Sequence, residues 1–213
     1  MERKLSITFG LAMTFAMNSA LAAGPVNEAQ WPGQGIRQGF HDSITNAGCA
    51  FASLGASNSW NAVNASFAIA ADLFYTYPRV QDQTQAFNYQ YITVEDAPNL
   101  PSPTALMKTR ILRDPGGGTI INADIFVISS RLDPAYADDG GFYCLTSSNV
   151  PGDQFDFESS MLHEFGHALG FQVTAEYYGD VNCAMYYGLA AGQARRTLCN
   201  TEKQEFLDAY GAL

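Results

Sequence analysis

The sequence predicts an α+β fold, in which a twisted mixed sheet is followed by a helix carrying the most distinctive motif of the chain. Three observations support this class. Strand-like segments gather between residues 87 and 129, a helical segment begins near Asp156, and another occupies residues 201–211. With 213 residues, the chain is long enough for one domain with a substantial core.

The first 22 residues have the organisation of a secretory signal peptide. The basic start MERK precedes the uncharged stretch LSITFGLAMTFAM, and Ala20 and Ala22 form an A-x-A cleavage pattern. This apolar stretch is short and interrupted for a membrane span, and an uncleaved anchor is the alternative. We therefore expect residues 23–213 to form one exported domain, secreted or periplasmic, with no membrane contact after signal cleavage.

The expected mature chain is strongly acidic. Of the 11 basic and 21 acidic residues, the signal contains Arg3, Lys4 and Glu2, which leaves 9 basic and 20 acidic residues and a net charge of −11. Such a surface repels nucleic acids and anionic membranes, so neither is an expected partner. We expect the protein to be a monomer.

The N-terminal part of this domain carries one clear helical pattern. Residues 24–56 are rich in Gly, Asn, Gln and Ser and read as irregular or weakly stranded. A first helix is predicted near residues 58–76, ended by Pro78, because apolar residues recur at helical spacing: Trp60, Val63, Phe67, Ala71 and Phe74.

Strands dominate the middle of the chain. Residues 87–96 alternate as a strand does, and residues 106–114 and 119–129 form two further predicted strands separated by the turn PGGG. Residues 140–147 read as a short edge strand.

Two helices complete the predicted fold. The first has Asp156 as its N-cap and Gly170 at the position after its last residue, where a left-handed backbone ends a helix at low cost. The second begins near Thr201, which fits a capping box with Gln204.

All four cysteines, Cys49, Cys144, Cys183 and Cys199, lie in the exported part. An even count in an oxidising compartment favours two disulfides, for which three pairings exist. We favour Cys183–Cys199, which closes a short loop, together with Cys49–Cys144.

The motif H-E-x-x-H at residues 163–167 carries the predicted chemistry. On a helix, His163 and His167 lie on one face and can direct imidazole nitrogens at a single ion. Zinc suits such ligands, and Glu164 can accept a proton from a zinc-activated water and pass it to the leaving amine. A coincidental pair of histidines on an amphipathic helix is the alternative.

Several stretches resemble the metzincin zinc proteases, and more narrowly their matrixin-like branch. FDFESSMLHEFGHALGF resembles the active-site helix, INADIFVISS the strand that borders the substrate cleft, CAMYYG the Met-turn and LCNTEKQEFLDAYG the closing helix. The helix of Trp60 falls where the family has its first helix. The resemblance covers most of residues 55–211 and implies a zincin-like catalytic domain, with Met185 as an apolar floor beneath the metal.

The chain departs from the family at the third histidine, where it has Val173. Two histidines and a carboxylate form an established catalytic zinc set, so Glu176 is our first candidate for the third ligand. Asp180 is the second candidate, although it can equally cap a turn. Tyr187 is the third, because some metzincins have a metal-proximal Tyr two residues after the Met. His41, the remaining histidine, reads as a surface residue.

The resemblance implies a zinc-dependent endopeptidase whose protein or peptide substrate lies along an edge strand of a shallow cleft. Two alternatives remain: a metzincin-like binding protein with weak or absent zinc because of Val173, and a metal-dependent hydrolase of a non-protein substrate. Calcium is a second candidate ion, because oxygen-rich loops suit it and the relevant region holds four aspartates: Asp133, Asp138, Asp139 and Asp153.

Overall fold

The computed structural model describes residues 26–27, 29–63, 65–76, 91–97, 105–133, 140–147, 149–172 and 180–212. The predicted signal peptide lies outside the described residues. Among the described helices, none has the length and apolar character needed to cross a membrane.

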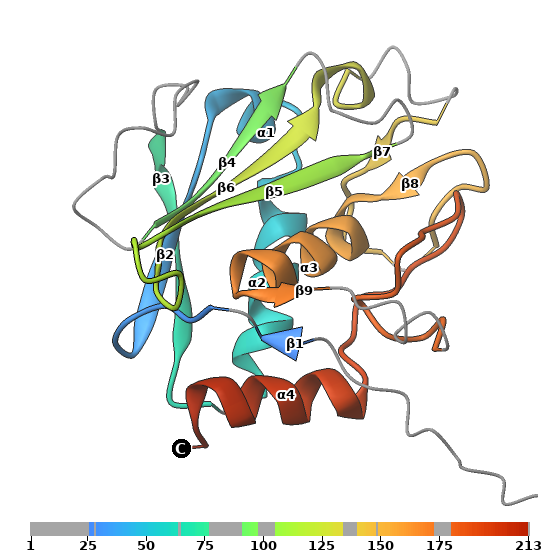
Figure 1. The fold of residues 1–213 in the computed structure, drawn as a ribbon. Helices are drawn as coiled ribbons and strands as arrows, with labels where there is room; N and C mark the ends of the chain where they lie inside the picture. The colour runs from blue at the N-terminus through green and yellow to red at the C-terminus, as the bar shows by residue number, and fades with distance from the viewer. Residues whose placement is uncertain are drawn as a thin grey trace, which may run out of the picture.

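A five-stranded mixed sheet with the strand order β3-β2-β4-β6-β5 is the largest element of the fold (Figure 1). Its strands are β2 (Gly35–Phe40), β3 (Ala68–Thr76), β4 (Tyr91–Ala97), β5 (Met107–Arg113) and β6 (Ile120–Ile128). All neighbours pair in parallel except β5, which is antiparallel to β6 and forms an edge. Together with four α-helices in the described chain, this mixed sheet agrees with the α+β class.

The strands predicted in the middle of the chain are largely confirmed. β5 and β6 fall within residues 106–114 and 119–129, and the tight turn between them contains Gly117 at φ 76°. β4 covers the second half of the predicted strand 87–96, whereas residues 87–90 lie outside the described residues. The short strand β7 (Phe142–Tyr143) is also present, but it pairs with β8 (Phe155–Asp156) in a separate small sheet.

The predicted helix near 58–76 is wrong over most of its length. The helix in this region is α2 (Ala50–Asn61), and residues 68–76 form β3 instead. Phe67 and Ile69 are buried whereas Ala68 and Ala70 are exposed, which is the period of two expected for a strand. The side-chain amide of Asn61, the last residue of the helix, binds both the N–H and the C=O of Ile69, at 2.8 and 2.9 Å, and so holds the start of β3 beside the end of α2.

The expectation that residues 24–56 are irregular or weakly stranded is correct for the strand β2 but misses the helices of this region. Residues 24–56 contain β2, the short helix α1 (Asp42–Asn46) and most of α2. The buried face of β2 is formed by Ile36, Gln38 and Phe40. This alternation is hard to recognise in the sequence, because many of the neighbouring residues are small or polar. On α2, small residues such as Ala52 and Ala56 are buried, so that this helix packs closely without a stripe of large apolar side chains.

Two helices, α2 and α3 (Phe157–Ala168), lie together on one side of the sheet, with α4 (Asn200–Tyr210) beyond them (Figure 1). Trp60 joins these layers. Its fully buried indole stacks on Phe171 at 5.6 Å between ring centroids, meets Phe206 edge-on at 5.2 Å, and donates Nε1–H to the carbonyl of Leu162. The core therefore fixes α3 against both neighbouring helices.

Both favoured disulfides, Cys49–Cys144 and Cys183–Cys199, are present. The predicted cap of the last helix is wrong: α4 starts one residue earlier, with Cys199 at the N-cap. Glu202 is the capping acid, since its Oε2 accepts the N–H of Cys199 at 2.8 Å. Gln204 instead bonds Asp208 on the exposed face of the helix.

Candidate functional site

The site is built on α3, whose start is held by a buried acid. The predicted N-cap is confirmed, because Asp156 Oδ2 accepts the N–H of Ser159 at 3.0 Å. The carboxylate of Asp156 is fully buried and binds Arg196, whose Nε lies 2.9 Å from Oδ2. Arg196 also forms an ion pair with Glu158, at 3.2 Å, so one guanidinium neutralises two acids at this end of the helix.

The other end of α3 is equally well held. Gly170 has a φ of 94°, which confirms the predicted left-handed position after the helix. Two terminal carbonyls that lack partners within the helix receive side-chain donors. Trp31 Nε1 donates to Ala168 O at 2.7 Å, and the hydroxyl of Tyr210 donates to Leu169 O at 2.8 Å.

The rings of His163 and His167 converge. Their Nε2 atoms lie 3.1 Å apart, while Nδ1 of His163 lies 2.9 Å from Ala184 O and Nδ1 of His167 lies 2.8 Å from Phe171 O. Because a carbonyl oxygen only accepts, each Nδ1 carries the proton and each Nε2 presents a lone pair. The backbone thus fixes both rings in the tautomer that binds metal through Nε2.

This arrangement fits a zinc ion. Two nitrogens bound at about 2.0–2.1 Å to one tetrahedral ion lie roughly 3.3 Å apart, close to the separation found here. Two facing lone pairs repel each other unless a cation or a shared proton lies between them. Burial, and secondarily the neighbouring His167, lower the pKa of His163, which favours the neutral, metal-binding form over the protonated one.

Glu164 is oriented by the edge strand of the sheet. Its Oε2 lies 2.6 Å from the hydroxyl of Thr109 on β5, and the same hydroxyl lies 2.9 Å from the backbone carbonyl of Glu164. The residue as a whole is 8% exposed, so it is mostly shielded from solvent. Glu164 is therefore a mostly buried carboxylate with a fixed hydroxyl partner, directly after the first of the two histidines in the chain.

Met185 lies directly against the helix that carries the histidines. It is fully buried, and a Cβ atom built on Gly166 would meet its sulfur at 2.1 Å and Trp60 at 3.2 Å. The residue before it, Ala184, supplies the carbonyl that holds His163. The turn around Met185 therefore packs against α3 through the methionine side chain, and it orients one of the two imidazoles through the carbonyl of Ala184.

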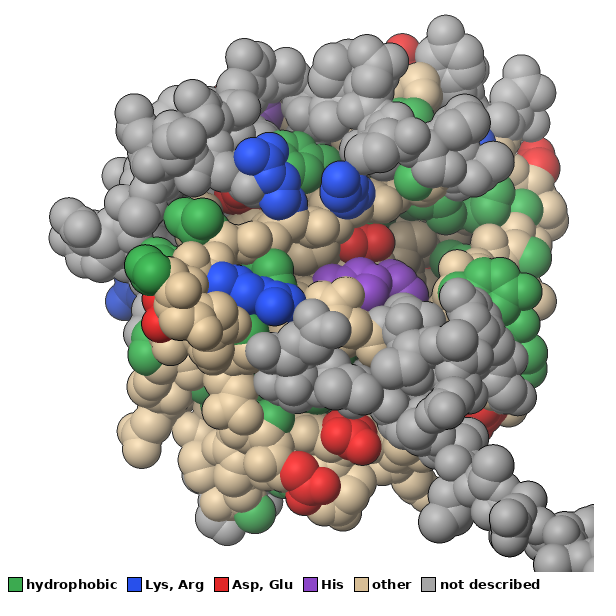
Figure 2. All heavy atoms as spheres, viewed as in Figure 1, with side chains coloured by type: hydrophobic (Ala, Val, Ile, Leu, Met, Phe, Trp, Pro, Cys, Tyr) green, Lys and Arg blue, Asp and Glu red, His purple; other side chains and the backbone are tan. Residues whose placement is uncertain are grey.

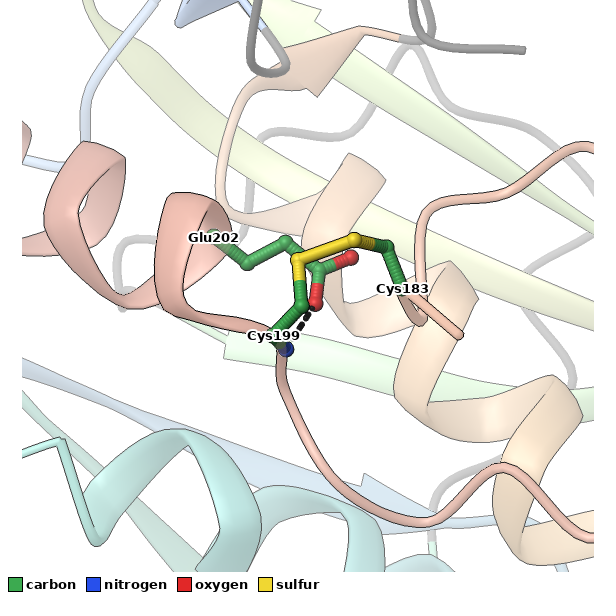
Figure 3. Close-up of side chains that lie close together, drawn as sticks. All are labelled: Cys183, Cys199 and Glu202. Atoms are coloured by element: carbon green, nitrogen blue, oxygen red, sulfur yellow. Dashed lines mark hydrogen bonds between the residues drawn. A yellow bond between two sulfur atoms is a disulfide. The ribbon is translucent and has the colours of Figure 1, made fainter. Parts of the chain in front are cut away.

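A buried carboxylate holds this turn in place (Figure 3). Glu202 Oε1 accepts the N–H of Met185, and Oε2 accepts the N–H of Cys199, which is joined to Cys183 by the disulfide. Cys183, Cys199 and Glu202 form the one cluster of three ligand-type side chains found among the described residues. Its thiols are oxidised and its carboxylate oxygens are occupied by backbone donors, so its role is structural.

A cleft of about 450 Å³ lies beside His163 and Glu164. Its lining includes residues 105–107 at the start of β5, and it also includes residues 186–189 with Arg195. Figure 2 shows histidine side chains in a hollowed part of this face, with Lys and Arg side chains above and to the left of them. The expectation that residues 121–130 border the cleft is wrong, because β6 lies inside the sheet and β5 takes the edge position.

The third ligand candidates have different outcomes. Val173 and Glu176 lie outside the described residues. The carboxylate of Asp180 accepts both N–H and Nδ2–H of Asn182 at 2.9 and 3.1 Å, so it caps the turn, as its alternative reading predicts. Tyr187 is 61% exposed and lines the cleft together with His163. In the described part of the chain, no third carboxylate, thiol or imidazole joins the two histidines in one cluster.

The remaining polar candidates lie in other settings. His41 is half-buried and caps α1, with its Nδ1 accepting the N–H of Ser43 at 3.2 Å. For calcium, Asp133 and Asp153 belong to no cluster of three ligand-type side chains among the described residues, and Asp138 and Asp139 lie outside them.

Sequence reasoning missed Thr109, Gly166, Arg195 and Glu202. Each acts through a contact with a segment far away in the chain, as with Thr109 and Glu164, which are 55 residues apart. One signal was available for Glu202: it stands three residues after Cys199, which is the capping-box spacing.

No protein-family model matches this chain, and no curated protein matches it either.

Proposed function

We propose that the protein is a secreted or periplasmic zinc-dependent endopeptidase, built as a matrixin-like metzincin domain. One observation carries the proposal: two Nε2 lone pairs, 3.1 Å apart, converge beside a shielded carboxylate at the edge of a cleft. The two disulfides support an oxidising compartment, as expected after export.

Each residue of the site has its own role in the proposed reaction. His163 and His167 would hold zinc, which polarises a peptide carbonyl and makes a nearby water more acidic. Glu164 takes the proton from that water and delivers it to the leaving amine, while Thr109 keeps the carboxylate oriented. Glu176, whose place in the chain suits a carboxylate ligand, remains the first candidate to complete the set.

The edge strand gives the substrate a place to bind. β5 pairs with β6 along one side, and its start at Met107 forms a wall of the cleft beside Glu164. An extended peptide can add to the free side of such a strand through backbone hydrogen bonds, which bind it largely independently of its side chains. This mode suits a protease that acts on proteins or peptides.

The test compares the expected mature chain, residues 23–213, with its Glu164→Gln variant. We expect both to bind one zinc ion, measured by metal analysis after dialysis, and only the unaltered chain to cleave casein or a quenched peptide. Removal of zinc by a chelator should abolish cleavage, and adding zinc back should restore it.

Two results would contradict the proposal. Cleavage that persists in the metal-stripped protein would exclude the zinc mechanism. A folded protein with neither zinc nor turnover would favour the binding-protein alternative, for which Val173 is the sequence argument.

A further inference from the structure

One wall of the cleft carries a cationic side chain, Arg195. Its backbone N–H donates to Ser159 Oγ on α3 at 2.6 Å, which ties this wall to the helix that carries the histidines. Its Nη2 donates to Gly188 O at 3.0 Å, and its guanidinium lies 5.2 Å from the centre of the Tyr186 ring. The half-buried side chain is therefore held in one orientation at the cleft.

Arg195 differs sharply from its neighbour in the chain. Arg196 forms ion pairs with Asp156 and Glu158, whereas Arg195 forms no ion pair in the part of the chain that the structure describes. Burial is the largest influence on Arg195 and lowers its pKa, while the nearby Glu202, Tyr186 and Asp180 act in the opposite direction without forming an ion pair with it. A guanidinium that has lost much of its water without gaining a carboxylate partner is poised to bind an anion.

The rest of the cleft decides which anion fits. A guanidinium has five N–H donors, and the two protein carbonyls in contact with Arg195, those of Tyr186 and Gly188, use two of them. The lining of the cleft combines the apolar side chains of Leu106, Met107, Phe155 and Leu189 with polar groups that include the hydroxyls of Ser159 and Ser160. Such a pocket accepts a short apolar stem that ends in a carboxylate.

We propose that Arg195 is a specificity-determining residue that binds a carboxylate of the peptide substrate inside this cleft. The inference rests on the proposed peptidase function and adds the substrate class: peptides with an acidic group close to the scissile bond. The carboxylate has two sources, either the side chain of an internal Glu or Asp or the free C-terminus of a short peptide.

The experiment uses residues 23–213 loaded with zinc and matched quenched peptides. In one arm, Glu and its uncharged isostere Gln are exchanged at each position around the scissile bond of peptides with an amidated C-terminus. In the other arm, a neutral peptide ends two residues past the scissile bond with either a free carboxylate or an amide. Cleavage is measured as kcat/KM, and affinity is measured separately on the Glu164→Gln protein, which binds without turnover.

The carboxylate should be preferred at one position by roughly 10- to 100-fold, the range of a charge-assisted hydrogen bond. The preference should disappear in Arg195→Gln and be partly retained in Arg195→Lys. The matched control Arg37→Gln removes an exposed charge on β2 and should leave the preference unchanged. The arm in which the preference occurs identifies the source of the carboxylate.

Failure of this inference can be told apart from failure of the proposed function. Equal binding of charged and neutral peptides, absence of binding by both, or a preference that persists in Arg195→Gln would overturn the inference. A carboxylate preference in binding, lost in Arg195→Gln but without turnover of any peptide, would support the inference and count against the peptidase.

Discussion

The sulfur of Met185 occupies the space that a Cβ atom on Gly166 would need, at 2.1 Å from its ideal position. Gly166 lies within the helix, between Glu164 and His167, so the absent side chain lets the buried methionine pack directly against the backbone of α3. The pair joins the helix of the site to the turn that follows residue 180.

Gly166→Ala should therefore destabilise the protein although alanine favours a helix. Overpacking of a full core costs about 1–3 kcal/mol. The overlap with the Met185 sulfur at 2.1 Å, with Trp60 at 3.2 Å, places the cost toward the upper end of this range, above the gain of about 1 kcal/mol in helix propensity. Urea unfolding measures the difference. Gly118→Ala is the matched control, since nothing lies within 4 Å of its added Cβ; equal stability of both variants would contradict the close packing.

Thr109→Val should lower kcat by about tenfold while zinc content and KM stay unchanged. The valine is nearly the same shape but removes the donor that lies 2.6 Å from Glu164 Oε2, so the carboxylate loses its orientation. Thr109→Ser keeps the hydroxyl and should recover most of the activity. If Val and Ser behave alike, the hydroxyl has no part in positioning Glu164.

Arg196→Gln should destabilise the fold by about 3–5 kcal/mol, because it leaves the fully buried Asp156 carboxylate without its counter-charge. Arg196 also donates to the carbonyls of Leu145 and Thr146, so the loop next to Cys144 should loosen at the same time. The exposed Arg37→Gln should change stability by no more than about 0.5 kcal/mol. Denaturant midpoints that agree between the two variants would show that the buried pair contributes little.

The two disulfides should differ in their effect on the site. Loss of Cys183–Cys199, with a separation of 16 residues, should cost roughly 3 kcal/mol, and loss of Cys49–Cys144, with a separation of 95, about 4.5 kcal/mol. Serine pairs replace each bridge. The Cys183/Cys199 variant should also weaken zinc binding, because Cys183 precedes Ala184, whose carbonyl orients His163.

Zinc titrations of both serine-pair variants measure this difference directly. The Cys49/Cys144 variant is the control, since this bridge joins the start of α2 to the residue after β7, away from the histidines. A larger loss of zinc affinity in that control would contradict the role given to the Met185 turn.

The sequence predicted the features whose cause is local. Asp156 caps α3 because its side chain reaches an N–H three residues away, and Gly170 ends α3 because it alone adopts a positive φ cheaply. His163 and His167 share a face because one helical turn separates them. The strands β5 and β6 follow from their alternation and the turn between them.

The prediction from local patterns was wrong where the same residues fit both the helical period and the strand period. Trp60, Val63 and Phe67 match helical spacing, yet Phe67 and Ile69 also match a strand. The segment forms a strand because it pairs with β2, where Ile69 lies beside Ile36, and because the side chain of Asn61 bonds to Ile69. Glu202, rather than the predicted Gln204, caps α4 because it stands at the capping-box spacing from Cys199. Its carboxylate also accepts a hydrogen bond from the N–H of Met185.

By itself, then, the sequence determined which residues could carry the chemistry: two histidines and a glutamate on one helix. Only the tertiary structure decided how they are aimed. The carbonyls of Ala184 and Phe171 select the tautomers, Thr109 orients the carboxylate, and Arg195 adds a cationic side chain to the cleft. Except for Phe171, which lies four residues after His167, these partners come from distant segments of the chain. Their contacts exist only once the core around Trp60 has brought sheet and helices together.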